Sequence, residues 1–186
     1  MKFWSLQKKD IIEYTLANGF YQPDFRKSDY LQLLPNIWPT YNLVLTSFNV
    51  VNGIDLPGLV FGFLYSSGHS LYEFANIGEF RTVVREKRAA IKSMWSNLAT
   101  EDALVVELEY EEQFNPILID INDFNFLIPP VGFPPPYTPE DVGRLRKDLL
   151  NGVINTSIFP SGMIQAHMPY IRAENIRQTY EIFDLM

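Results

Sequence analysis

The sequence predicts an α+β fold, in which one domain spans residues 1–186 and a mixed or antiparallel sheet of about four to six strands is flanked by helices. Segments with apolar residues at alternate positions, such as Ala103–Tyr110, are typical of strands. Segments with apolar residues three or four positions apart, such as Glu79–Leu98, are typical of helices. The chain contains no internal repeat and no linker-like stretch, which indicates a single domain.

The chain is expected to open with one strand and two helices. Phe3–Gln7 fits a short strand, and Lys8–Asn18 fits a helix with apolar residues on one face. Gly19 would end that helix, because glycine readily adopts the left-handed conformation after a last helical turn. Ser28–Leu34 fits a second short helix, which Pro35 would stop.

Tyr41–Val51 is ambiguous between helix and strand. Val44, Phe48 and Val51 are spaced as on one helix face, whereas the β-branched content favours a strand. We expect a helix here. Gly58–Ser66 then fits a buried strand, because nearly all of its residues are apolar.

The middle of the chain is expected to hold the longest helix, over Glu79–Leu98. Two strands should follow, at Ala103–Tyr110 and at Pro116–Ile121. Asp123 is typical of the residue that caps a short helix after the second strand, since aspartate accepts hydrogen bonds from a first helical turn.

The last third begins with a proline-dense stretch, in which Pro134–Pro136 should form stiff polyproline II. Thr138 fits the N-cap of a further helix, which Gly152 would end. A strand over Met163–Ile171 and a short closing helix within Arg172–Leu185 would complete the fold.

Composition excludes several classes of function. With 47% hydrophobic and 20% charged residues, the chain can bury a core. It has no cysteine, which excludes disulfides, a thiolate nucleophile and cysteine-ligated zinc, and which suits the cytoplasm. The net charge of −7 disfavours direct binding to nucleic acids or anionic membranes and allows a basic protein partner. We also expect no signal peptide and no membrane span.

Motifs for phosphate loops, dinucleotide binding, zinc proteases and serine hydrolases are missing from the sequence. Two histidines, His69 and His167, are too few for a histidine-rich metal site. We therefore expect no metal and no cofactor, and the missing motifs disfavour an enzyme without excluding one.

Gln165 and His167 are two polar residues spaced by two on an otherwise apolar strand. Because residues i and i+2 share one face of a strand, both side chains need partners on the same side of the sheet. They either line a ligand-binding cleft or form hydrogen bonds within ordinary sheet packing, and packing is the commoner origin of such a pair.

Four glutamates lie close together in and just after the strand over Ala103–Tyr110; they are Glu107, Glu109, Glu111 and Glu112. Such a row could bind a cation or repel nucleic acid, and it is a candidate surface for interaction with a partner. The alternative interpretation is a solvated sheet edge that its charge protects from aggregation.

Three arginines give the segment Glu79–Leu98 a basic character in an acidic protein; they are Arg81, Arg85 and Arg88. They could meet a phosphate or an acidic partner. The alternative is an ordinary solvated helix face.

Short motifs at several places resemble an uncharacterised bacterial domain family, whose members open with a Trp-Thr-x-Gln strand and end in an Ile-Phe-Asp-Leu tail. The matching residues here are Trp4-Ser5-Leu6-Gln7, Val106-Glu107-Leu108-Glu109, Gln165-Ala166 and Ile182-Phe183-Asp184-Leu185. The resemblance spans nearly the whole chain and implies a stand-alone cytosolic protein of unknown function.

The layout more distantly resembles ADP-ribosyltransferase domains, in which an Arg or His on the first strand holds NAD and a late Glu stabilises the transition state. This chain has Gln7 at the first position, and Gln165 and His167 at the second. Neutral glutamine cannot supply the negative charge that such a transition state needs. The resemblance therefore implies binding of NAD or another nucleotide, with Trp4 as a nearby aromatic, and disfavours catalysis.

Three hypotheses follow, in order of preference. The first is a cytosolic binding protein that acts on a protein partner, of the kind with which phages and mobile elements inhibit a host protein. The second is an ADP-ribosyltransferase-like nucleotide-binding protein, active or degenerate. The third is an acidic mimic of nucleic acid, which ranks last because only about four carboxylates are clustered.

Overall fold

The computed structural model describes residues 1–186 with the exception of 69, 112–113, 129–137, 151–156, 158 and 186. Three sequence predictions lie outside the described residues. They are the polyproline II segment Pro134–Pro136, the helix end at Gly152 and the position of Glu112.

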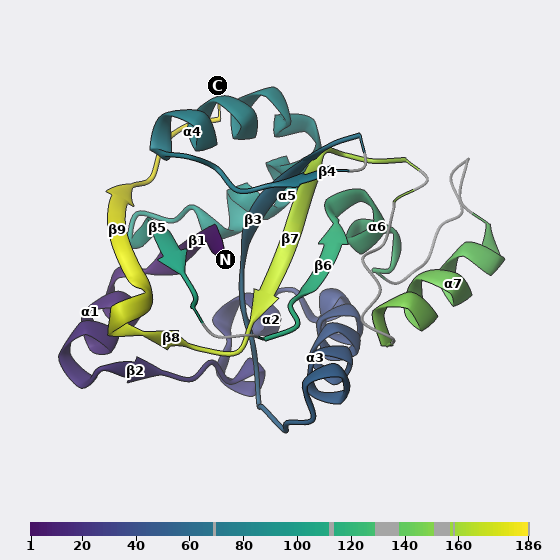
Figure 1. Ribbon diagram of the computed structural model, residues 1–186, viewed down its shortest axis with the longest axis horizontal. Coiled ribbons are helices and arrows are strands. Elements are labelled where there is room, and N and C mark those ends of the chain that lie inside the picture. The colour runs from purple at the N-terminus through teal and green to yellow at the C-terminus, as the bar shows by residue number, and fades with distance from the viewer. Residues whose placement is uncertain (69, 112–113, 129–137, 151–156, 158, 186) are drawn as a thin grey trace.

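An antiparallel sheet forms the centre of the molecule (Figure 1). Its strands are β1 (Lys2–Lys8), β3 (Val60–Ser67), β4 (Ser70–Tyr72), β5 (Ala103–Glu109), β6 (Ile117–Asp120), β7 (Met163–Met168) and β9 (Ile176–Glu181). The order is β6–β7–β3–β1–β5–β9, and β4 extends from β3 beside this path. A separate two-stranded sheet pairs β2 (Phe20–Tyr21) with β8 (Ile171–Arg172).

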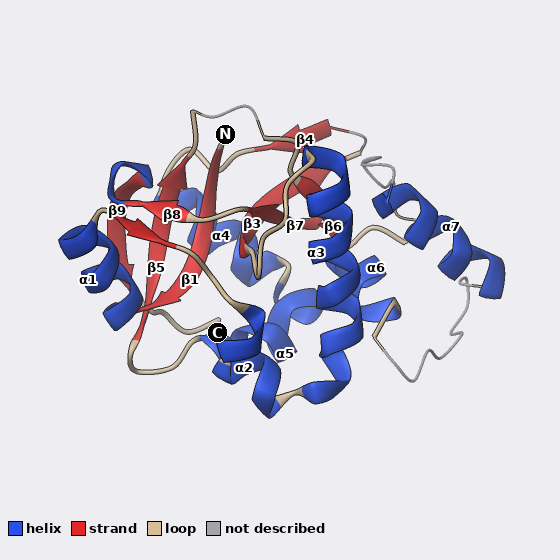
Figure 2. Ribbon diagram, turned by 90° about the horizontal axis from the view of Figure 1, so that it is seen from below, coloured by secondary structure: helices blue, strands red, loops and turns tan. Residues whose placement is uncertain are grey.

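Helices pack around the sheet and confirm the predicted α+β class. They are α1 (Lys9–Asn18), α2 (Asp29–Leu33), α3 (Trp38–Asn52), α4 (Ile77–Glu86), α5 (Arg88–Leu98), α6 (Ile121–Phe126) and α7 (Pro139–Leu150). Figure 2 shows α1 at one end of the sheet and α7 on the far side of α3. The seven-stranded sheet is slightly larger than the predicted four to six strands, because the β4 hairpin adds a short strand.

Strand register assigns the side chains to two faces. Trp4 lies opposite Phe63, and Phe63 lies opposite Gln165, so these three side chains share one face. Helices α4 and α5 cover this face around Trp4, while α3 and α6 cover it around β6. The other face carries Val106 and Ile164 and packs against α1 through Ile12.

Local signals set the early elements as predicted. Gly19 ends α1 in the left-handed conformation, with φ of 82°, and its N–H donates to the carbonyl of Thr15. The side chain of Ser28 caps α2 by accepting from Leu31 N. The ambiguous segment Tyr41–Val51 is helical as expected and lies within α3, whose buried stripe faces the sheet.

The predicted single helix over Glu79–Leu98 is wrong, because the chain forms two helices that meet at Lys87. Lys87 leaves the helical conformation with φ of −93° and ψ of 14°. The bend lets Phe80 of α4 and Trp95 of α5 enter the same core cluster. One straight helix of that length would carry part of its apolar stripe beyond the sheet.

The predicted closing helix is also wrong. Residues after β8 form a short 3₁₀ turn at Ala173–Asn175 and then β9, which pairs with β5. The buried side chain of Asn175 holds this turn, because its Oδ1 accepts from Arg172 N at 2.8 Å and its Nδ2 donates to the Glu109 carbonyl at 3.1 Å. Pairing with an available strand outweighs a weak helical pattern here.

The helix after β6 is capped by Asp120, three residues before the predicted cap Asp123. Asp120, at the end of β6, accepts from Asn122 N at 2.8 Å and from Ser161 N at 3.0 Å. Asp123 instead lies in the first turn of α6, where it is buried and accepts from Ser157 Oγ at 2.7 Å. Asp120 therefore joins the start of α6 to the segment before β7.

Candidate binding groove and buried polar pair

A groove of about 990 Å³ opens where α1, β2 and α2 meet the ends of β1 and β3. We call it the aromatic groove. Its aromatic lining includes Tyr14, Phe20, Tyr21, Tyr30, Tyr41 and Phe61. The volume is near the upper end of the range of small-molecule pockets, and the groove is open to solvent.

The wall that carries Tyr21 is fixed by pairing and by one glutamine. Tyr21 lies opposite Ile171 in the short sheet of β2 and β8. Next to it, Gln22 Nε2 donates to the carbonyls of Gly58 at 3.3 Å and Pro169 at 3.0 Å. These bonds tie the wall to the chain before β3 and after β7, so the groove is built between fixed elements.

The groove has an acidic rim. Its lining contains four aspartates, Asp10, Asp24, Asp29 and Asp102, against two lysines, Lys8 and Lys27. Lys8 Nζ donates to Asp29 at 2.6 Å. This hydrogen bond raises the pKa of Lys8, and the carboxylates of Asp29, Asp102 and Asp10 add to the effect by attraction.

Tyr21 combines an aromatic ring with a hydroxyl group that can form a hydrogen bond. Burial raises the pKa of its phenol above the usual value of 10.0, and the negative charges of Asp10 and Asp24 raise it further. The side chain therefore stays neutral at physiological pH and keeps its O–H as a donor.

Gln7 lies in the groove but on the opposite side of the sheet from Gln165. It is three residues after Trp4 on β1, so the two side chains point to opposite faces, and Trp4 shares its face with Gln165. Gln7 Nε2 donates to Ser5 Oγ at 2.8 Å. The sequence-predicted candidates Gln7 and Gln165 thus do not meet.

Gln165 is fully buried among apolar side chains. Its Nε2 lies 3.5 Å from the Tyr41 hydroxyl and 3.4 Å from Met94 Sδ, while its Oε1 has no hydrogen-bond partner among the described residues. The Tyr41 ring also packs edge to face against Tyr30, with ring centroids 6.2 Å apart, and burial raises the pKa of Tyr41 well above its usual value. Tyr41, which lines the groove, therefore links Gln165 to it.

His167 is also fully buried, beside Phe61 and Ile117. Its Nδ1 lies 3.0 Å from the Ile117 carbonyl, which can only accept, so Nδ1 carries the proton. Burial lowers the pKa of His167 from 6.5 to about 4. The imidazole is therefore neutral at physiological pH and is not accessible to a ligand in the groove.

Trp4 belongs to the core rather than to the groove. Its ring is fully buried and stacks on Phe80, with ring centroids 5.2 Å apart, and lies beside Tyr180 at 5.6 Å. Among the four ligand-binding candidates predicted from the sequence, Gln7 alone lines the aromatic groove.

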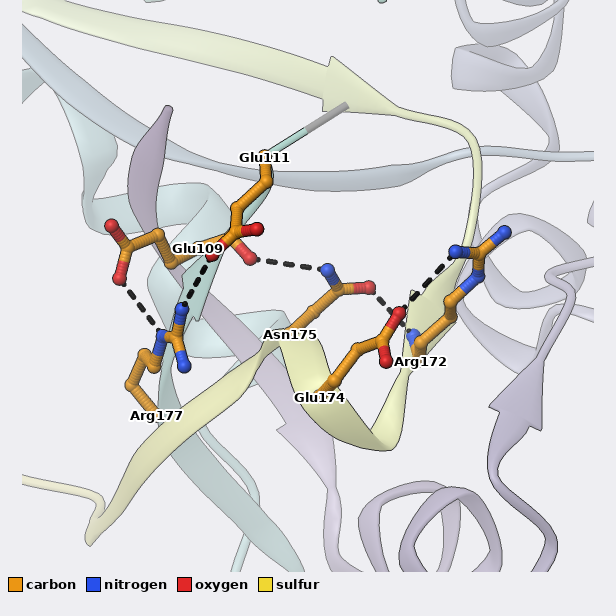
Figure 3. A pocket seen from close by; sticks show the side chains of 6 residues that line it. All are labelled: Glu109, Glu111, Arg172, Glu174, Asn175 and Arg177. Carbon is orange, nitrogen blue, oxygen red and sulfur yellow. Dashed lines mark hydrogen bonds and ion pairs between the residues drawn. The ribbon is translucent and has the colours of Figure 1, made fainter. Parts of the chain in front are cut away.

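Glu107 and Glu109 of the acidic row do not lie on a sheet edge, because their strand β5 is internal and β9 is the edge strand. Glu107 forms an ion pair with Lys2 at 3.5 Å. Glu109 and Glu111 share Arg177, at 2.8 and 3.5 Å (Figure 3). A second hollow of about 500 Å³ is lined by Glu109, Glu111, Arg172, Glu174, Asn175 and Arg177. The negative charges of this row are therefore partly balanced by cations of β1 and β9.

The basic residues of α4 contact the C-terminal segment of the described chain. The guanidinium carbons of Arg81 and Arg85 lie 5.2 and 5.5 Å from the ring centroid of Phe183. Arg85 Nε also donates to the Asp184 carbonyl at 3.2 Å. Arg88, the first residue of α5, is exposed. Two of the three arginines thus stabilise the tail through cation–π contacts.

No family model, curated protein or solved structure matches the chain. Within the described residues, no helix is long and apolar enough to cross a membrane. In the same residues, no group of histidine, aspartate and glutamate side chains is arranged to hold a metal ion. The resemblances noted in the sequence therefore stay predictions.

Sequence reasoning missed the aromatic groove. Tyr14, Tyr21, Tyr30 and Tyr41 come from separate elements and show no common spacing. The high content of aromatic residues was the one available signal, and it is also explained by filling of the core. The acidic rim gave no signal either, because its aspartates are isolated in the sequence.

Proposed function

We propose that this protein is a binding protein that holds a segment of a partner protein in the aromatic groove. The observation that carries the proposal is an open groove of about 990 Å³ with apolar side chains exposed at its mouth. Tyr14 is 54% exposed and Leu33 is 79% exposed, and both line the groove. Aromatic side chains are enriched in the centres of protein interfaces because they supply a large contact area.

Binding fits the groove better than catalysis. Gln165 and His167, the polar pair to which the sequence drew attention, are buried and bonded to groups of the fold. Neither can touch a substrate in the groove without rearrangement of the core. A cytoplasmic location is part of the proposal and is supported by the cysteine-free composition.

The charges of the rim weigh against a nucleotide as the ligand. Four aspartates and two lysines line the groove, and one of the lysines is already bonded to Asp29. Phosphate groups would be repelled by this excess of carboxylates. The nucleotide alternative predicts a higher melting temperature with millimolar NAD. The alternative of an acidic nucleic-acid mimic predicts that the protein competes with DNA for a basic protein. However, Lys2 and Arg177 already form ion pairs with Glu107 and Glu109 of the acidic row.

Site-specific photo-crosslinking tests the proposal in the organism that encodes the protein. The photoreactive residue p-benzoyl-phenylalanine replaces Tyr14 in the groove or, as a matched control, Tyr72 on β4. The two tyrosines are similarly exposed, at 54% and 43%, and Tyr72 does not line the groove. We expect a discrete protein adduct from the Tyr14 position and none from the Tyr72 position. Equal adducts from both positions, or none from the Tyr14 position, would overturn the proposal.

A further inference from the structure

Carboxylates outnumber cations where α1 begins at the groove. Lys8 is bonded to Asp29 at 2.6 Å, and the negative charges of Asp102 and Asp10 also act on its ammonium group. Asp10 and Asp24 in turn act on the phenol of Tyr21. The charge of the rim residue Asp10 therefore acts both on Lys8 and on Tyr21 of the aromatic lining.

Two of the four rim carboxylates have cationic partners and two do not. Asp29 pairs with Lys8, and Asp24 pairs with Arg26 at 3.0 Å. Among the described residues, Asp10 and Asp102 form no ion pair. Asp10 Oδ1 accepts from Ile11 N at 2.7 Å, and Asp102 Oδ1 accepts from the Thr100 hydroxyl. Each of these two carboxylates keeps further acceptor capacity.

Aromatic side chains lie near Asp10. Tyr14 lies four residues after Asp10, on the same face of α1, and the phenol of Tyr21 on β2 is affected by the charge of Asp10. The faces of aromatic rings carry partial negative charge and attract cations within about 6 Å of the centroid. Carboxylates and ring faces therefore favour the same kind of ligand group here.

We propose that this end of the groove binds a lysine or arginine side chain of an extended basic segment of the partner protein, between the carboxylates of Asp10 and Asp102 and the rings of Tyr14 and Tyr21. The inference rests on the proposed function, since it names the chemistry of the segment that the groove holds. The aliphatic stem of such a side chain would cover the rings while its charged end reaches the rim.

The geometry explains why the cation is part of a longer segment. The lining of the groove also includes Tyr30, Leu31 and the exposed Leu33 of α2, and its volume of about 990 Å³ exceeds that of one side chain. The apolar side chains of Leu31 and Leu33 suit a neighbouring aliphatic residue of the same segment. The protein's net charge of −7 would also speed the approach of a basic partner.

Selection of random peptides displayed on phage, against the immobilised full-length protein, tests the inference. The rim variant is Asp10→Asn with Asp102→Asn, in which the amide oxygens can still accept from Ile11 N and from the Thr100 hydroxyl. The matched control is Asp55→Asn with Glu86→Gln, which makes the same change in net charge at two exposed residues away from the groove. The groove variant, Tyr14→Ser with Leu33→Ser, removes apolar contacts at the mouth.

We expect the native protein to enrich peptides with a lysine or arginine beside an apolar residue. The dissociation constant of an enriched peptide should rise about tenfold in the rim variant, in line with the loss of two partly exposed charge contacts, and should not change in the control. It should also rise with salt. The groove variant should weaken the same peptide by a similar factor.

The outcomes separate this inference from the proposed function. Enriched peptides that lack basic residues and are weakened only by the groove variant would overturn the inference and leave the groove as a binding site. If the groove variant binds the enriched peptides as tightly as the native protein does, or if no peptide is enriched, both the inference and the proposed function are contradicted. Spermidine serves as a free cation, and if it alone binds at micromolar concentration while no peptide does, the groove holds a small amine and the inference is wrong.

Discussion

His167 provides a test of how burial controls stability. In the folded protein its pKa is lowered to about 4, against 6.5 for an unperturbed imidazole, because the ring is fully buried. The unfolded chain therefore binds the proton more tightly than the folded protein. Stability contributed by the neutral histidine is complete above pH 6.5 and is lost progressively as the pH falls towards 4.

The size of the effect follows from the two pKa values. A difference between 6.5 and about 4 corresponds to a full loss of about 3 kcal/mol in acid. Between pH 7 and pH 5 the linkage relation gives a loss of about 2 kcal/mol, since most of the titration of the unfolded chain falls in this interval. Few other groups titrate there, although carboxylates contribute at the acidic end.

Urea unfolding followed by tryptophan fluorescence measures this loss, because Trp4 and Trp95 are buried. The background carries His69→Asn, so that His167 is the one histidine left in the chain. The comparison protein adds His167→Asn, whose amide can still donate to the Ile117 carbonyl but does not titrate.

The His69→Asn protein should lose about 2 kcal/mol more between pH 7 and pH 5 than the protein with both substitutions. The common contributions of the carboxylates cancel in this difference. If the two proteins lose the same stability within about 0.5 kcal/mol, the reasoning that burial lowers the pKa of His167 is refuted. If His167→Asn does not fold, His167→Gln replaces it in the same comparison.

Three further predictions concern close packing and buried polar groups. Gly62→Ala should destabilise the protein by about 1–3 kcal/mol, because its Cβ would lie 1.9 Å from Phe3 Cδ2. Gly143→Ala has open space inside α7 and should instead stabilise by about 0.5–1 kcal/mol, so equal effects of the two changes would contradict this account. Asn175→Ala leaves the Glu109 carbonyl without its side-chain donor and should cost about 1–3 kcal/mol. Urea unfolding at neutral pH measures all three, and an unchanged midpoint for Asn175→Ala would show that the 3₁₀ turn does not need this side chain.

Elements with strong local signals were predictable from the sequence. The α1 helix ends at Gly19 because a left-handed residue was needed there and glycine supplies it at little cost. The strand β5 follows the alternation of apolar residues in Ala103–Tyr110, and Ser28 caps α2 with its own side chain. In each case the deciding interaction lies within a few residues of the chain.

Predictions failed where distant segments compete for one stretch of chain. The segment after Asn175 carries a weak helical pattern, but β5 offers it a free edge, and it pairs there as β9. Asp120 rather than Asp123 caps α6, because Ser161 brings a second donor to Asp120 from the segment before β7. Neither partner is visible from the local sequence.

By itself, the sequence determined the α+β class, the position of most helices and strands and the acidic, cysteine-free character of the protein. Tertiary structure alone decided that Gln7 and Gln165 lie on opposite faces of the sheet, because this depends on strand register. It also decided that Asp10, Asp102 and Tyr21 line one groove, since these residues come from segments far apart in the chain. Local propensity is encoded within a few residues, whereas a binding groove forms only when such segments pack together.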